Sequence, residues 1–151
     1  GSWSLYASSL IGSKGAIVGV DLNPPEKSVL SKLHIPEDGF IVGDIFSEEV
    51  ETRIEKHAPF HVILSDAAPN TTGNRTVDTG RSFTLSQKVV DYAQTMLSPG
   101  GNLVVKIFQG GDEQELYKTM KHLFDSVKAY KPKASRAPSM EIYYIGMGKK
   151  G

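Results

Sequence analysis

The sequence of 151 residues contains no cysteine and no long apolar run. Disulfides, thiolate metal sites and a cysteine nucleophile are therefore excluded. No segment approaches the roughly 18 apolar residues that a membrane-spanning helix needs, and no basic-then-apolar leader points to secretion. The four histidines lack ligand-like neighbours, so we expect no metal site. We therefore expect a cytoplasmic protein without a membrane partner, or an organellar one if a transit peptide has been removed.

A surplus of one charge sign is also lacking, because 17 basic residues balance 17 acidic ones. The balance does not hold along the chain. Residues 117–151 contain only Asp125 and Glu141 as acids, against a larger set of bases: Lys118, Lys121, Lys128, Lys131, Lys133, Arg136, Lys149 and Lys150. This segregation indicates an anionic partner, although a solvated basic face would look the same.

Segments typical of strands and helices alternate along the chain. Short apolar runs predict strands at residues 16–21, 40–42, 62–66 and 102–106, each buried on both faces. Between and around them, apolar spacing predicts helices over 4–11, 48–56, 79–97 and 113–124, with Pro99-Gly100-Gly101 as a stop. This alternation predicts an α/β fold with a doubly wound, mostly parallel sheet.

The two ends of the chain depart from this alternation. Residues 126–131 and 141–147 predict two strands separated only by a loop, which favours an antiparallel pair at one sheet edge. At the other end a helix precedes the first strand, whereas a doubly wound domain begins with a strand and a glycine-rich turn. We therefore expect residues 1–151 to form a single domain whose first strand lies upstream of this numbering.

Four ionisable residues stand where the predicted strands end: Asp21, Asp44, Asp66 and Lys106. Ligands of open α/β sheets bind outside the carboxyl ends of the strands. Aspartate and lysine are rarely buried without a partner. Any one of these acids could be a helix cap or a loop residue, but the four together favour a binding site.

Asp21 has the position of a carboxylate that accepts hydrogen bonds from two ribose hydroxyls. This signal fits NAD or S-adenosylmethionine. Asp44, which follows Gly43, is expected beside the adenine, where it can accept from an exocyclic amine.

The stretch from 65 to 70 reads Ser-Asp-Ala-Ala-Pro-Asn, with Asp66 followed by small residues that let a ligand approach the backbone. Its alternative is a strand-to-loop turn with a side-chain-to-backbone hydrogen bond. Lys106 ends an apolar strand, so we expect partial desolvation to lower its pKa and make it a general base. Its alternative is a lysine whose ammonium simply reaches solvent.

Several motifs together resemble the FtsJ/RrmJ-type RNA 2′-O-ribose methyltransferases, and the likeness covers essentially the whole chain. The Asp-Ala-Pro-Asn and Lys-Ile-Phe-Gln-Gly stretches are the most specific. The motifs, in order, are Gly1-Ser2-Trp3-Ser4, Asp21-Leu22, Gly43-Asp44, Ser65-Asp66-Ala67-Ala68-Pro69-Asn70, Pro99-Gly100-Gly101, Val104-Val105-Lys106-Ile107-Phe108-Gln109-Gly110, Ser135-Arg136-Ala137 and Ser139-Met140-Glu141-Ile142-Tyr143.

The resemblance implies a Rossmann-like fold with an antiparallel last strand and S-adenosyl-L-methionine as cofactor. It implies methyl transfer to a ribose 2′-hydroxyl of RNA, with a uridine of large-subunit ribosomal RNA as the favoured target. A transfer RNA anticodon loop, a messenger RNA cap and a non-catalytic RNA-binding module on the same fold remain alternatives. From the residues alone, a nicotinamide-dependent oxidoreductase is a further rival.

The resemblance also assigns roles to residues. Asp66, Lys106 and Glu141 match three members of a Lys-Asp-Lys-Glu tetrad, whose first lysine is expected upstream. Lys106 would be the base, although Asp66 would pull its pKa upward. Asp66 would therefore steer the lysine and face the sulfonium, and Glu141 would hold the lysine or the ribose. Around the cofactor, Gly1 and Trp3 would form a border, while Asp21 would hold the ribose and Asp44 the adenine.

In this interpretation the basic C-terminal part binds RNA. Lys131, Lys133 and Arg136 surround the loop before Glu141, so we expect them to bind RNA phosphates with little sequence reading. Tyr130, Tyr143 and Tyr144 could stack on bases, although core packing is the usual role of such residues. We expect the protein to act as a monomer.

Overall fold

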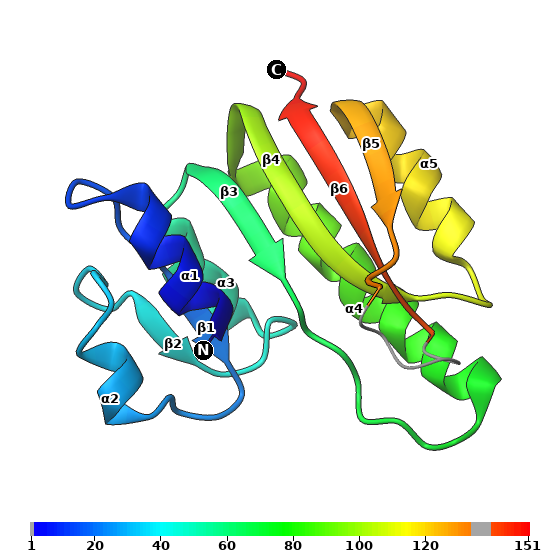
Figure 1. Cartoon of the computed structure of the whole chain (residues 1–151), viewed down its shortest axis with the longest axis horizontal. Helices are drawn as coiled ribbons and strands as arrows, with labels where there is room; N and C mark the ends of the chain where they lie inside the picture. Colours follow the sequence, from blue (N-terminus) through cyan, green and yellow to red (C-terminus); the bar gives the residue numbers. More distant parts are fainter. Residues whose placement is uncertain (1, 134–139) are drawn as a thin grey trace. The chain divides into compact units, whose positions relative to one another are not determined.

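The computed structural model describes residues 2–133 and 140–151, and the chain divides into two compact units, Gly1–Ala58 and Pro59–Gly151 (Figure 1). Gly1 and Arg136, two of the predicted site residues, lie outside the described residues. Within the described ranges, none of the helices combines the length and the apolar character needed to cross a membrane.

The first unit contains a two-stranded parallel sheet. Its helices are α1 (Ser2–Ile11), α2 (Lys27–Leu30) and α3 (Glu48–Glu55), and its strands are β1 (Gly19–Asp21) and β2 (Phe40–Val42). The register pairs Gly19 with Phe40 and Asp21 with Val42, and the Gly43 amide continues the pairing by donating to the Asp21 carbonyl at 2.8 Å. The carboxyl ends of both strands therefore lie side by side.

Helix α3 begins where local chemistry favours it. The Ser47 side chain accepts a hydrogen bond from the Val50 amide at 3.2 Å, and three glutamates in the first turn complement the positive end of the helix. Val50 and Ile54 are buried, as is Ile41 of β2. A side chain at Gly43 would place its Cβ only 2.6 Å from Val50 Cγ2, so this packing requires glycine after β2.

The described residues of the second unit form a four-stranded sheet with two helices. Its elements in chain order are β3 (Phe60–Ser65), α4 (Arg75–Met96), β4 (Leu97–Phe108), α5 (Glu113–Leu123), β5 (Phe124–Tyr130) and β6 (Glu141–Lys149). The strand order is β3-β4-β6-β5, in which β3 and β4 are parallel while β6 is antiparallel to both of its neighbours. The predicted antiparallel pair at the sheet edge is confirmed.

The helices of this unit share one face of the sheet. Alternate residues of β4 and β6 are buried there, namely Leu103, Val105, Ile107, Ile142 and Tyr144, and α4 contacts α5 as well as the sheet (Figure 1). On the opposite face, Val62 and Leu64 of β3 are 50% and 44% exposed. Within this unit neither α4 nor α5 covers that side, so its own helices do not bury this strand on both faces as predicted.

The junction between α4 and β4 also differs from its prediction. The helix begins at its cap Asn74, before the expected residue 79, and the strand starts at Leu97 directly after the helix. The predicted stop, Pro99-Gly100-Gly101, lies inside β4. Gly100 has a φ of 85°, and a Cβ on Gly101 would lie 2.9 Å from the His61 carbonyl, at the point where the register with β3 shifts. The glycines thus form an irregularity within the strand instead of ending an element.

Candidate active site

A cluster of charged and polar side chains lies at the end of β4. Lys106 Nζ is 2.9 Å from Asp66 Oδ1 and 3.3 Å from Glu141 Oε1, and only 11% of the lysine side chain is exposed. The Tyr143 hydroxyl donates a hydrogen bond to Asp66 Oδ1 at 2.7 Å, and Nζ lies 5.9 Å from the centre of the Tyr143 ring. We call these four residues, Asp66, Lys106, Glu141 and Tyr143, the Lys106 cluster.

The strand register explains why these four residues meet. Lys106 of β4 lies opposite Tyr143 of β6, and Glu141 stands two residues before Tyr143, so all three side chains are on the same sheet face. Asp66 follows β3, whose last residue Ser65 pairs with Val105. Three strands therefore deliver their ionisable groups to one point, on the face away from α4 and α5.

Charge decides the protonation of Lys106. Burial of the ammonium lowers the pKa of Lys106, but the hydrogen bond and charge of Asp66, with contributions from Tyr143 and Glu141, outweigh burial and raise this pKa above its ordinary value. Desolvation lowers this pKa as predicted, but the predicted net lowering is wrong for this structure. The upward pull expected from Asp66 prevails, because two carboxyl groups lie within ion-pair distance of the ammonium.

Tyr143 belongs to this cluster in a way that neither predicted role describes. Burial, followed by its hydrogen bond to Asp66, raises the pKa of Tyr143 to about 12, so the phenol keeps its proton and remains a donor at neutral pH. The signal available in the sequence was its spacing of two residues from Glu141 on a predicted strand, which places both on one face. Tyr144 points to the other face, where its ring packs edge-on against the Tyr117 ring, with 5.2 Å between the two ring centres.

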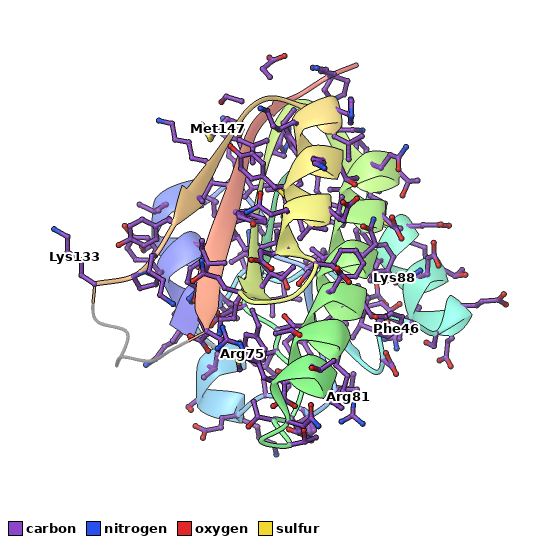
Figure 2. All side chains as sticks on the ribbon, turned by 90° about the vertical axis from the view of Figure 1, so that its right-hand side faces the viewer. Phe46, Arg75, Arg81, Lys88, Lys133 and Met147 are labelled. Atoms are coloured by element: carbon purple, nitrogen blue, oxygen red, sulfur yellow. The ribbon has the colours of Figure 1, made fainter. Side chains whose placement is uncertain are left out.

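Hydrogen bonds from the residues after β4 and after β5 hold the start of β6. The Gln109 amide donates to the Met140 carbonyl at 2.7 Å, and Lys131 Nζ donates to the Glu141 carbonyl at 2.6 Å. Lys131, predicted to bind RNA, thus lies directly beside the cluster. Lys133 is exposed and extends away from the sheet (Figure 2).

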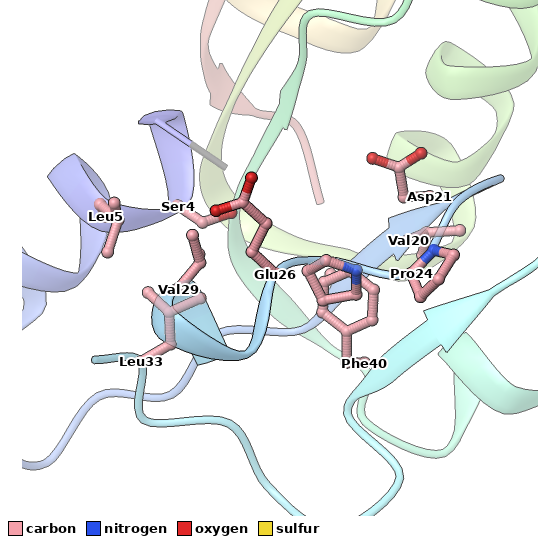
Figure 3. A pocket seen from close by; sticks show the side chains of 11 residues that line it. Ser4, Leu5, Val20, Asp21, Pro24, Glu26, Val29, Leu33 and Phe40 are labelled. Carbon is pink, nitrogen blue, oxygen red and sulfur yellow. The ribbon is translucent and has the colours of Figure 1, made fainter. Parts of the chain in front are cut away.

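The first unit contains a cavity of about 550 Å³ at the end of β1 (Figure 3). Asp21 lines it together with apolar and polar neighbours: Ser4, Leu5, Gly19, Val20, Pro24, Pro25, Glu26, Val29, Leu33 and Phe40. Two carboxyl groups, those of Asp21 and Glu26, lie among apolar side chains in these walls. Such a lining suits a nucleoside, whose ribose offers two hydroxyls and whose base is flat and apolar on its faces. The cavity has the volume typical of small-molecule sites, so these residues fit a nucleoside cofactor.

The other predicted cofactor residues of this unit are placed less directly. Neither Trp3 nor Asp44 is among the described residues that line the cavity, although Trp3 directly precedes Ser4. Asp21 Oδ1 accepts from the Asn23 amide at 3.1 Å and Asp44 Oδ1 from the Phe46 amide at 2.9 Å. Both acids therefore form the loop hydrogen bonds of the alternative interpretation, while both side chains remain exposed at adjacent strand ends.

The described part of the chain contains no group of three or more histidine, aspartate or glutamate residues arranged to hold a metal ion.

Related sequences, solved structures and a family model connect this fold and site with known proteins. A ribosomal RNA large subunit methyltransferase E of Borrelia garinii subsp. bavariensis is 42% identical over 146 residues, which cover 97% of this chain and 73% of the relative. The enzyme of the same name from Treponema denticola is 40% identical over 151 residues, covering 100% and 74%. A Plasmodium falciparum structure described as a ribosomal RNA methyltransferase superposes with a TM-score of 0.79 at 25% identity, covering 100% of this chain and 82% of that one.

A structure from Clostridium thermocellum, described as an rRNA methylase, has a TM-score of 0.58 at 17% identity and supports the fold alone. The strand order with its antiparallel last strand, the nucleoside-sized cavity and these likenesses define a Rossmann-like methyltransferase. The chain belongs to the FtsJ-like methyltransferase family, whose model matches residues 1–149. The predicted fold class, enzyme class and cofactor, S-adenosylmethionine, are thereby confirmed, and the nicotinamide-dependent alternative is set aside.

Proposed function

We propose that this protein transfers a methyl group from S-adenosylmethionine to a ribose 2′-hydroxyl of large-subunit ribosomal RNA, with a uridine as the acceptor nucleoside. The observation that carries the proposal is the Lys106 cluster, in which an ammonium is fixed between two carboxyl groups at 2.9 and 3.3 Å. The names of the relatives from Borrelia and Treponema support the ribosomal target. We further propose that residues 1–151 act as one methyltransferase domain, as a monomer in the cytoplasm.

In the proposed mechanism Lys106 orients the acceptor hydroxyl and accepts its proton at Nζ. Asp66 and Glu141 take two of the hydrogen-bonding directions of the ammonium, which leaves one for the 2′-oxygen. Alignment of this kind contributes roughly 7–11 kcal/mol to lowering a barrier, and a positioned base adds about 10²–10⁴-fold. When bound, S-adenosylmethionine supplies the methyl group on a positively charged sulfonium.

Lys106 can act as a base only in its neutral form, which the two carboxyl groups oppose. A positive charge brought close to Asp66 offsets that carboxylate and so lowers the pKa of Lys106. Asp66 therefore has two proposed roles. It holds Lys106 Nζ in place, and it makes the protonation of Lys106 depend on the charge of a ligand bound beside Asp66. Tyr143 keeps the Asp66 carboxyl oriented, and Glu141 keeps Nζ from turning away.

For the cofactor, we propose that Asp21 binds the ribose hydroxyls and Asp44 the adenine amine, with Gly1 and Trp3 at the border. The exposed carboxyl groups at neighbouring strand ends and the adjoining cavity support these roles. For the RNA, we propose that Lys131, Lys133 and Arg136 neutralise phosphates beside the acceptor ribose. The hydrogen bond from Lys131 to the Glu141 carbonyl supports this position.

The test offers the purified protein and labelled S-adenosylmethionine to undermethylated large ribosomal subunits, free ribosomal RNA and transfer RNA, followed by mapping of 2′-O-methyl ribose. We expect label on the large subunit or its RNA, and we expect Lys106→Ala to abolish it while cofactor binding stays nearly intact. Lys118→Ala, at an exposed lysine of α5 paired with Glu115, is the control and should keep full activity. Label on transfer RNA would overturn the substrate, and full activity of Lys106→Ala would overturn the role of the lysine.

A further inference from the structure

Helix α4 buries polar side chains along its N-terminal half. Asp78, Thr79, Ser82 and Ser86 are 2–4% exposed, whereas the C-terminal half buries Val89, Val90, Ala93 and Met96. Buried hydroxyl and carboxyl groups cost free energy unless they are hydrogen-bonded. We call the four polar residues the polar face of α4 and consider which groups they bind.

Two serines of this face bind the backbone of the strand that carries Lys106. The Ser86 hydroxyl lies 2.8 Å from the Lys106 carbonyl and 2.8 Å from the Ser82 carbonyl, so its one proton is shared between two acceptors. The Ser82 hydroxyl accepts a hydrogen bond from the Phe108 amide at 2.9 Å. Both serines are therefore linked to β4 on either side of Ile107.

These bonds replace a missing strand neighbour. β3 ends at Ser65, which pairs with Val105, so from Lys106 onward β4 has β6 on one side and no described strand on the other. The Lys106 carbonyl and the Phe108 amide are two residues apart and hence point to the same side. Four helix residues advance about 6 Å and two strand residues about 6.6 Å, so serines four residues apart fit these two groups.

The same face holds the loop that follows Asp66. The Asp78 carboxyl accepts from the Thr72 amide and hydroxyl, each at 2.8 Å, and from the Gly73 amide at 3.2 Å. Helix α4 thus anchors the end of β4 and the loop after β3 through one row of side chains. Asp66 and Lys106, which form the ion pair, lie on those two segments.

We propose that Ser82 and Ser86 are positioning residues that set Lys106 Nζ against Asp66 and Glu141 by fixing the backbone of β4 at Lys106 and Phe108. This inference rests on the proposed function of Lys106. The serines lie on the helix side of the sheet and the Lys106 cluster lies on the opposite face, so they act through the strand and not on the substrate. Loss of either hydroxyl leaves a backbone group without its partner and lets the end of β4 shift.

The first test measures methyl transfer in single turnovers over a range of pH with Ser86→Ala, and compares two controls. We expect Ser86→Ala to slow transfer about tenfold to hundredfold at unchanged cofactor affinity, because small displacements of a catalytic group have effects of this size. The rise of the rate with pH should move to lower pH, because Lys106 loses part of its contact with Asp66. Ser86→Thr, which keeps the hydroxyl, should restore both the rate and the pH profile.

The controls separate positioning from stability. Val90→Ala removes buried packing one turn farther along α4, so it should lower the Tm without moving the pH profile. Thr84→Ala removes an exposed hydroxyl that bonds only within the helix, to the Gly80 carbonyl, and should change neither. A wild-type rate and profile in Ser86→Ala would overturn the proposal. The proposal would also be overturned if, in both Ser86→Ala and Val90→Ala, the rate fell in proportion to the Tm.

The second test needs no activity. Hydrogen exchange of the Phe108 amide should accelerate about tenfold or more in Ser82→Ala, because its acceptor is removed, and should not change in Thr84→Ala. Unchanged exchange at Phe108 in Ser82→Ala would show that the Ser82 hydroxyl does not hold the Phe108 amide. If the wild-type protein methylates no RNA, the proposed function fails, while this exchange experiment still decides whether Ser82 holds the strand.

Discussion

Lys106 is the residue around which the second unit concentrates its charge. Its ammonium is nearly buried, and burial alone would favour the neutral amine. Asp66 at 2.9 Å and Glu141 at 3.3 Å reverse that preference. At this scale the chemistry of the site is a balance between desolvation and two nearby carboxyl groups, and removal of one carboxyl group tests the balance directly.

Asp66→Asn should lower the pKa of Lys106, because it removes the largest contribution that raises this pKa and leaves the burial that lowers it. If Lys106 is the base, the pH at which methyl transfer rises should move downward. Glu141→Gln should move it in the same direction by less, since Glu141 makes the smallest of the raising contributions. The measurement is the pH dependence of single-turnover rates, and an upward shift in Asp66→Asn would contradict this account of the cluster.

Tyr143→Phe removes one hydrogen bond from Asp66 and keeps the ring. We expect transfer to slow about twofold to tenfold, which corresponds to the net 0.5–1.5 kcal/mol of a typical hydrogen bond. Cofactor affinity should not change. Tyr130→Phe, at the exposed cross-strand neighbour on β5, is the control, and an equal loss of rate in both variants would assign the effect to the sheet instead of the Asp66 contact.

Helix α3 of the first unit depends on the hydrogen bond that caps its N-terminus. Helix α3 has eight residues, so its cap is a substantial part of its stability. Ser47 supplies the cap, and Val50 and Ile54 join the helix to the small core that includes Ile41. The cap therefore supports the packing behind Gly43 and Asp44.

Ser47→Ala should lower the free energy of unfolding by about 1 kcal/mol, the usual contribution of a serine N-cap. Ser47→Asp should retain most of the stability, because aspartate caps helices equally well and suits the positive end. Chemical denaturation followed by circular dichroism measures both. An Ala variant as stable as the wild type would show that the tertiary contacts of α3 hold it without the cap.

At the scale of the whole molecule the charge is neutral but segregated, because residues 117–151 contain many more basic than acidic residues. If this segment binds RNA phosphates as proposed, the affinity should fall as salt rises. Lys133 is the clearest place to test it, because its side chain is exposed, whereas Lys131 also bonds to the Glu141 carbonyl and its loss would disturb the Lys106 cluster.

Lys133→Glu should weaken binding of large-subunit ribosomal RNA and reduce the slope of log affinity against log salt by about 0.7–0.9 for the phosphate contact that is lost. Lys118→Glu makes the same charge change on α5 at a lysine paired with Glu115 and serves as the control. Filter binding at several salt concentrations measures both variants. Equal slopes in wild type and Lys133→Glu would place the RNA on another surface.

Local pattern in the sequence determined the alternation of elements, the antiparallel edge pair and the residues at the strand ends, because helix and strand periods and cap residues act over a few positions. The meeting of Asp66, Lys106 and Glu141 was also predictable from the sequence through a resemblance to a family. The contact distances themselves follow from the strand register, which pairs Lys106 with Tyr143.

The sequence named the two opposing influences on the Lys106 pKa, and only the tertiary structure decided which of them prevails. It alone decided the role of Tyr143 and the contacts of Ser82 and Ser86. Each depends on groups that are distant in the chain and within about 3 Å in space, where electrostatic and hydrogen-bonding energies change steeply with separation. The same is true of Gly100 and Gly101, which the sequence presents as a helix stop and the register with β3 places inside a strand.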